Sequence, residues 1–134
     1  MKETRSLEGK KIFFVEDDMF LANIISRRIK EAGGSVTHVT DGSEAVVRIP
    51  KETPHILLLD LLLPGGIDGF EVLEKIKADP VTKDVPVVII SNLDQPADIE
   101  KGMKLGAYRF LIKASVTPPE IVEHIAAALH SELT

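Results

Sequence analysis

The chain has 134 residues, of which 44% are hydrophobic and 28% charged, the size and composition of one globular domain. It contains no cysteine, so disulfides, thiol catalysis and zinc–thiolate sites are excluded. The formal net charge is -5 and the basic residues are scattered, which disfavours direct binding to nucleic acid.

Short apolar runs alternate with amphipathic stretches along the chain. Runs of valine, isoleucine and leucine predict buried strands, whereas apolar residues spaced three or four apart predict helices. In chain order, the pattern predicts strand 11–15, helix 19–32, strand 35–40, helix 41–50, strand 55–60, helix 69–78, strand 85–91, helix 96–105, strand 107–113 and helix 117–129. Asp41 with Glu44 resembles a capping box for the second helix, which is expected to end near Pro50, and Thr117 with Glu120 resembles one for the last helix.

The predicted strands are mainly near-continuous runs of valine, isoleucine and leucine rather than an alternation of apolar and polar residues. Both faces of the sheet are therefore expected to lie under helices, as in a parallel sheet. Five strand–helix units in succession predict an α/β fold, a doubly wound parallel sandwich. We expect one domain over residues 10–130, with an N-terminal extension at 1–9 and a C-terminal tail at 131–134.

Neither a leader peptide nor a membrane segment is expected. The first ten residues, MKETRSLEGK, lack the apolar core of a signal peptide. The longest apolar run, ILLLDLLL, is interrupted by Asp60 and stops at Pro64, well short of the roughly 20 residues that a membrane helix needs. We therefore expect a cytoplasmic protein that does not bind membranes.

Polar side chains follow four of the five predicted strands. Because the carboxyl ends of parallel strands meet at one edge of the sheet, these side chains are expected to share a crevice. Asp60 interrupts a run of leucines, and a buried charge needs a partner, water or a metal, so Asp60 is expected to mark the end of burial. The converging residues are Glu16, Asp17 and Asp18 after the first strand, Asp60 after the third, Ser91 after the fourth and Lys113 after the fifth.

This combination of side chains suits phosphoryl transfer. Converging carboxylates repel one another unless a cation binds them, and Mg²⁺ prefers oxygen ligands. Asp17 and Asp60 are expected to bind Mg²⁺, with Glu16 holding a metal-bound water. The Asp60 carboxylate can attack phosphorus to give an acyl phosphate, while Lys113 and the Ser91 hydroxyl contact the phosphoryl oxygens.

With these residues in place, the chain resembles a response-regulator receiver domain, the phosphoacceptor of two-component signalling. The resemblance runs from about Lys10 to Leu129, and its matching positions are Glu16, Asp17, Asp60, Pro64, Ser91 and Lys113. It implies a flavodoxin-like (βα)5 fold with strand order 2-1-3-4-5. It also implies phosphorylation of Asp60 by a sensor histidine kinase or a histidine phosphotransfer protein. Only self-catalysed phosphorylation and dephosphorylation are implied, so an enzyme acting on a separate substrate is not expected.

The resemblance further implies how a signal leaves the site. The backbone carbonyl of Leu62 is expected to complete the Mg²⁺ ligands. Ser91 and Phe110 are expected to form a switch in which the Phe110 ring changes rotamer after phosphorylation. A downstream protein, or a second copy in a homodimer, would bind the face formed by the fourth helix, the fifth strand and the last helix, about residues 96–129.

Three positions depart from the family pattern. The loop PGGIDG is one residue longer than usual, and Gly65-Gly66 is expected to absorb the insertion as a bulge. Ala114 follows Lys113 where the family has a proline with a cis bond, so we expect either a trans bond with a rearranged loop or a strained cis bond. Asn92 stands where a small residue is usual and is expected to narrow access to the phosphoryl group.

Other functions fit parts of the pattern. A Mg²⁺-dependent phosphohydrolase with an aspartyl nucleophile would need an acid two residues after Asp60, where Leu62 stands. A docking pseudo-receiver that works without phosphorylation would normally lack an acid, the hydroxyl or the lysine. Asp17 or Asp18 alone could simply cap a helix. The histidines lack the spacing of metal ligands, and surface or strand-edge positions are expected for His38, His55, His124 and His130.

Overall fold

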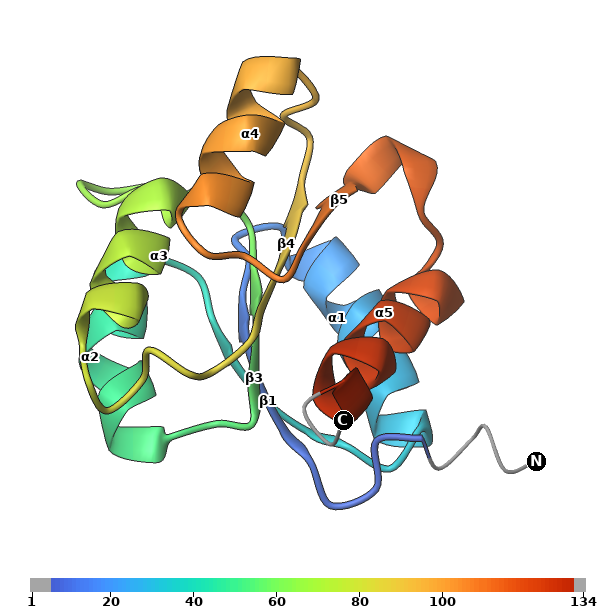
Figure 1. Cartoon of the computed structure of the whole chain (residues 1–134). Coiled ribbons are helices and arrows are strands. Elements are labelled where there is room, and N and C mark those ends of the chain that lie inside the picture. The colour runs from blue at the N-terminus through green and yellow to red at the C-terminus, as the bar shows by residue number, and fades with distance from the viewer. Residues whose placement is uncertain (1–5, 132–134) are drawn as a thin grey trace.

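The computed structural model describes residues 6–131 as a five-stranded sheet between two layers of helices (Figure 1). The strands are β1 (Lys11–Val15), β2 (Ser35–Val39), β3 (Ile56–Leu59), β4 (Val87–Ser91) and β5 (Arg109–Ile112). The helices are α1 (Met19–Glu31), α2 (Gly42–Glu52), α3 (Gly69–Ala78), α4 (Pro96–Lys104) and α5 (Pro118–Ser131). The 3-10 helix η2 (Lys113–Ser115) joins β5 to α5. Each strand and helix predicted from the sequence is present.

All neighbouring strands are parallel, and their order is β2-β1-β3-β4-β5, as predicted. The last residue of β1, Val15, pairs with Val39 of β2 and with Leu59 of β3. Ser91 at the end of β4 pairs with Ile112 at the end of β5. The carboxyl ends of the strands therefore lie at one edge of the sheet, where the predicted site residues follow them.

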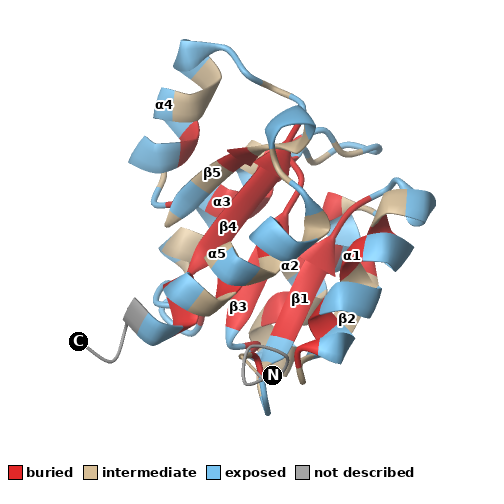
Figure 2. Cartoon of the chain, turned by 90° about the vertical axis from the view of Figure 1, so that its right-hand side faces the viewer, coloured by how far each residue is buried: buried red, intermediate tan, exposed pale blue. Residues whose placement is uncertain are grey.

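Helices cover both faces of the sheet. On one face, α1 and α5 pack against β1 through a cluster that includes Phe14, Ile25 and Ile125. On the other, α2 and α3 pack through a cluster that includes Phe13 and Ile76. Figure 2 shows β1, β3 and β4 as the buried centre of the domain, which explains why their sequences are continuously apolar, whereas the edge strands β2 and β5 are partly exposed. Within residues 6–131, no helix is both long enough and apolar enough to cross a membrane.

Two predicted helix caps are present, one of them in a different form. Thr117 and Glu120 form a full capping box, because the Thr117 N–H donates to Glu120 Oε1 at 2.8 Å and the Glu120 N–H donates to Thr117 Oγ1 at 3.3 Å. Asp41 accepts the Glu44 N–H at 2.8 Å. The Glu44 carboxylate, however, pairs with Arg48 at 2.9 Å, so Asp41 acts as a simple N-cap rather than as half of a box.

Two boundaries differ from the sequence-based expectation. Helix α2 continues through Pro50 to Glu52, because a proline in the last turn removes only one hydrogen bond from a helix that is already ending. Leu7 is fully buried, and its N–H donates to the carbonyl of Ala32 at 2.9 Å. Leu7 therefore packs as part of the domain, while residues 1–5 of the expected extension 1–9 lie outside the described residues.

Candidate functional site

The loop after β1 divides its three acids between two tasks. Asp18 caps α1, because its carboxylate accepts the N–H of Leu21 at 3.1 Å. Glu16 is fully buried, and its Oε2 accepts the N–H of Asp18 at 3.0 Å. Asp17 is exposed and faces the other acids, since carboxylate oxygens of Glu16, Asp17 and Asp60 all lie within 4.8 Å of one another. Asp18 is therefore the helix cap, and Asp17 is the acid that joins Glu16 and Asp60.

Asp60 lies deeper than expected. It is 2% exposed and the following Leu61 is 1% exposed, so the prediction that burial ends at Asp60 is wrong by one residue. Burial continues because the start of α3 packs onto this segment: a Cβ at Gly69 would overlap the backbone of both residues. The buried carboxylate is stabilised by Lys113 Nζ at 3.0 Å from Oδ2 and by the Leu62 N–H at 3.2 Å from Oδ1.

Lys113 lies between two buried carboxylates. Its Nζ is 3.0 Å from Oε1 of Glu16 and 3.0 Å from Oδ2 of Asp60. Burial lowers the pKa of Lys113, but its hydrogen bonds and charge interactions with both acids outweigh burial and raise the pKa above its usual value. Burial, together with the negative charge of Asp60, raises the pKa of Glu16 to about 7. One lysine is therefore too little positive charge for this cluster.

The acid cluster has the donor set of a divalent cation site. Its side-chain ligands are all oxygen atoms, which suit Mg²⁺ or a similar hard cation. Oε1 of Glu16 is buried and accepts no hydrogen bond, although Lys113 Nζ lies 3.0 Å away as a charge partner and donates to Oε2 at 3.2 Å. Oε1 therefore remains available as an acceptor for a cation. The side chain of Leu62 is 51% exposed, and the predicted role of its carbonyl as a ligand stays a prediction.

Ser91 and Phe110 lie on β4 and β5, the two strands that follow β3 in the sheet. The Ser91 hydroxyl is buried at the end of β4, where it accepts the N–H of Leu93 at 3.3 Å and keeps its own hydrogen available to donate. Phe110 pairs with Ile89 in the sheet, and its half-buried ring lies next to Gly102 of α4. The ring of Phe110 thus contacts α4, and the roles of Ser91 and Phe110 as a switch stay predictions.

The departures from the expected loop pattern have local solutions. Gly65 has a φ of 87° in an exposed loop, a left-handed conformation that glycine adopts at little cost, so the extra residue is absorbed there. Every peptide bond within residues 6–131 is trans, including the bond between Lys113 and Ala114. Of the two alternatives, the trans bond is the one present, and the chain turns there through η2.

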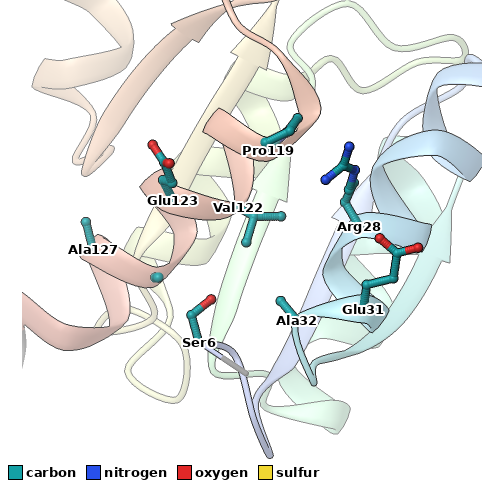
Figure 3. A pocket seen from close by; sticks show the side chains of 9 residues that line it. Ser6, Arg28, Glu31, Ala32, Pro119, Val122, Glu123 and Ala127 are labelled. Carbon is teal, nitrogen blue, oxygen red and sulfur yellow. The ribbon is translucent and has the colours of Figure 1, made fainter. Parts of the chain in front are cut away.

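A groove of about 500 Å³ lies elsewhere, between α1 and α5 (Figure 3). Arg28 and Glu31 from the end of α1 line one side, and Val122 and Glu123 of α5 line the other. The acids precede the first residue of α1, so they lie at the opposite end of that helix. The groove is therefore separate from the acid cluster, which lies at the open edge of the sheet.

Comparisons with known proteins agree with this geometry. A family described as the response regulator receiver domain matches residues 12–126, which include the acid cluster and Lys113. Response regulator PleD from Caulobacter vibrioides is 35% identical over 103 residues, which are 77% of this chain and 22% of PleD. This chain therefore spans about a fifth of the length of that relative.

Solved structures share the whole fold. The crystal structure of a putative response regulator from Chloroflexus aurantiacus has a TM-score of 0.83 and 29% identity, with 90% of this chain and 98% of that chain covered. The Mn²⁺-bound form of response regulator Rcp1 has a TM-score of 0.78 and 27% identity, with 88% and 92% covered. The fold predicted from the order of the elements is thus confirmed.

Proposed function

We propose that this chain, which belongs to the family of response regulator receiver domains, accepts a phosphoryl group on Asp60. The observation that carries the proposal is the position of Asp60, buried with Lys113 Nζ at 3.0 Å and two further acids beside it. A carboxylate nucleophile next to a lysine and a candidate cation site has the charge distribution that phosphoryl transfer requires.

In the proposed reaction, an Asp60 oxygen attacks the phosphorus of a phosphohistidine. A new O–P bond forms, the P–N bond breaks, and the leaving imidazole nitrogen keeps the electron pair and takes a proton. Bound Mg²⁺ supplies positive charge to the phosphoryl oxygens. Glu16, Asp17, Asp60 and the carbonyl of Leu62 would hold it. Lys113 and the Ser91 hydroxyl would each donate a hydrogen bond to the transferred group.

The partners follow from this chemistry. The donor would be a sensor histidine kinase or a histidine phosphotransfer protein, which places the chain in the cytoplasm with its donor. Phosphorylation adds acceptor oxygens and negative charge, so Ser91 and Lys113 would gain charge-assisted hydrogen bonds only in the phosphorylated state. Because Phe110 lies against α4, a shift near Ser91 would reach the face formed by α4, β5 and α5, where a downstream protein or a second copy would bind.

The site offers little support for rapid hydrolysis of a separate substrate. Two residues after Asp60, where a phosphohydrolase would place its general acid, Leu62 has an exposed apolar side chain. We therefore propose that the only reactions are the phosphorylation and slow dephosphorylation of Asp60 itself.

Intact-mass measurement after incubation with Mg²⁺ and acetyl phosphate tests the proposal. The parent chain should gain the mass of one phosphoryl group, and chelation of Mg²⁺ should prevent it. Asp60→Asn should gain none. Asp84→Asn, which changes an exposed aspartate at the amino end of β4, is the matched control and should label like the parent. An unlabelled parent, or equal labelling of Asp60→Asn, would overturn the proposal.

A further inference from the structure

His38 connects the edge strand β2 to the loop that carries the acids. It pairs with Phe14 of β1, and the two ring centroids lie 5.6 Å apart. Its Nε2 lies 2.7 Å from the backbone carbonyl oxygen of Glu16. Because a carbonyl can only accept, Nε2 carries the hydrogen and donates it. The half-buried imidazole therefore holds the backbone at the first acid.

This hydrogen bond continues the β1–β2 ladder beyond its last pair. The carbonyl of Val39, the last residue of β2, accepts the N–H of Glu16 at 3.0 Å. The carbonyl of Glu16 then finds its donor in the side chain of His38. The Glu16 carbonyl and the Asp17 N–H belong to one planar peptide unit. Fixing the direction of that carbonyl also fixes the direction in which the chain enters Asp17.

The position of the Asp17 carboxylate depends on the direction of the backbone more than the positions of the Glu16 and Asp60 carboxylates do. The side chains of Glu16 and Asp60 are buried and contact Lys113, whereas the side chain of Asp17 is exposed. We propose that His38 is a positioning residue of the divalent cation site, because it orients the peptide from which Asp17 projects toward the other two carboxylates. This inference rests on the proposed function, since it assumes that the acids bind Mg²⁺.

The histidines of this chain offer a matched set of variants. His38→Phe keeps a ring against Phe14 but removes the donor, and His38→Val is a second donor-free variant suited to a strand. His38→Gln returns an N–H donor of similar reach. His55→Phe is the control, because the His55 Nδ1 accepts the N–H of Lys11 at 2.9 Å, at the opposite end of β1.

The measurements are the Mg²⁺ dissociation constant by calorimetry, the amide ¹⁵N shift of Asp17, and the phosphorylation rate as a function of Mg²⁺. We expect His38→Phe and His38→Val to weaken Mg²⁺ binding about three- to tenfold and to shift the Asp17 amide. Phosphorylation at saturating Mg²⁺ should stay within about twofold of the parent rate, because the reacting groups are unchanged. His38→Gln should regain most of the affinity, and His55→Phe should bind Mg²⁺ like the parent.

The outcomes separate the two proposals. If the parent binds Mg²⁺ and is phosphorylated while the donor-free variants bind Mg²⁺ equally well, the role of His38 is overturned and the proposed function stands. Equal weakening in His55→Phe, or no recovery in folded His38→Gln, would also overturn it. If the parent neither binds Mg²⁺ nor accepts phosphate, both proposals fall.

Discussion

The Nζ atom of Lys113 lies 3.0 Å from an oxygen of Glu16 and 3.0 Å from an oxygen of Asp60, so one cation faces two buried acids. These contacts join the end of β5 to the ends of β1 and β3. Removing one member of a buried charge cluster leaves the others uncompensated, which costs far more than breaking a surface pair.

Lys113→Met should therefore destabilise the metal-free protein strongly. We expect the free energy of unfolding at pH 8 to fall by about 2–4 kcal/mol, and saturating Mg²⁺ to recover part of the loss. Lys104→Met is the control, since Lys104 lies 3.6 Å from Glu100 in a highly exposed pair on α4, and should cost less than about 1 kcal/mol. Urea unfolding measures both, and equal losses would contradict the buried cluster.

Glu16 should make the stability of the metal-free protein depend on pH. The pKa of its carboxyl is raised from 4.5 to about 7 in the folded state by burial and by Asp60, so the folded chain holds this proton more tightly than the unfolded chain. The resulting stability is fully present below pH 4.5 and is lost as the pH rises through about 7. Glu16→Gln should remove this loss, on the order of 1–3 kcal/mol.

Urea unfolding at pH 5 and pH 8 without divalent cations checks this prediction. Asp17, Asp60, Lys113 and His38 surround Glu16 and are the same in both proteins, so the difference between the parent and Glu16→Gln isolates the glutamate. The parent should lose more stability than Glu16→Gln between the two pH values. Parallel curves would show that the Glu16 pKa is not raised by folding.

The order of the elements and the edge of the sheet could be predicted because both follow from local patterns. Continuous apolar strands require cover on both faces, and the ends of parallel strands share one edge. This reasoning alone brought together Glu16, Asp17, Asp60 and Lys113. It could not find the depth of Asp60, because that depends on α3 packing through Gly69 onto the backbone of the same segment.

The contact between His38 and Glu16 could not be predicted either. The two residues lie 22 positions apart, and they meet because Phe14 pairs with His38 in the β1–β2 register. The sequence around His38, a strand rich in β-branched residues, does not indicate which residue its side chain contacts. Its position on the edge strand β2 agrees with the expectation from sequence. Only the three-dimensional register shows that its side chain binds the acid loop.

The lifetime of the phosphoryl group should depend on Leu62. Its N–H donates to Asp60 Oδ1 at 3.2 Å, and its exposed side chain therefore lies at the mouth of the site. A leucine cannot orient a water for attack on phosphorus, so Leu62→Asn should speed hydrolysis of the Asp60 adduct by about threefold or more. Asn92→Ala should also change the decay rate, because Asn92 lies exposed directly after Ser91.

Decay of the adduct can be followed by intact mass after acetyl phosphate is removed. Leu62→Met is the matched control, because it changes the shape of the side chain and offers no strong hydrogen bond. It should decay like the parent. Unchanged decay in both Leu62→Asn and Asn92→Ala would exclude these side chains as determinants of the lifetime.

The space beneath α4 should control the Phe110 ring. A Cβ at Gly102 would lie 2.9 Å from Cδ1 of Ile89 and 3.0 Å from Cδ2 of Phe110, closer than ordinary contacts. Gly102→Ala should therefore displace the ring and lower the free energy of unfolding by about 1–2 kcal/mol, even though alanine favours helix. Amide shifts should change over residues 96–112 before any phosphorylation, while Asp60 should still accept phosphate.

Two further variants identify the ring as the cause. Gly66→Ala is the control, because its Cβ would meet nothing within 4 Å and its φ is not positive, so stability should stay within about 0.5 kcal/mol of the parent. Adding Phe110→Leu to Gly102→Ala should restore part of the lost stability, since the smaller side chain makes room for the new methyl group. If Gly102→Ala instead stabilised the protein by about 1 kcal/mol, helix propensity alone would explain it. In that case Gly102 would not hold the ring in place, and the coupling from Ser91 to α4 would have to run through other residues.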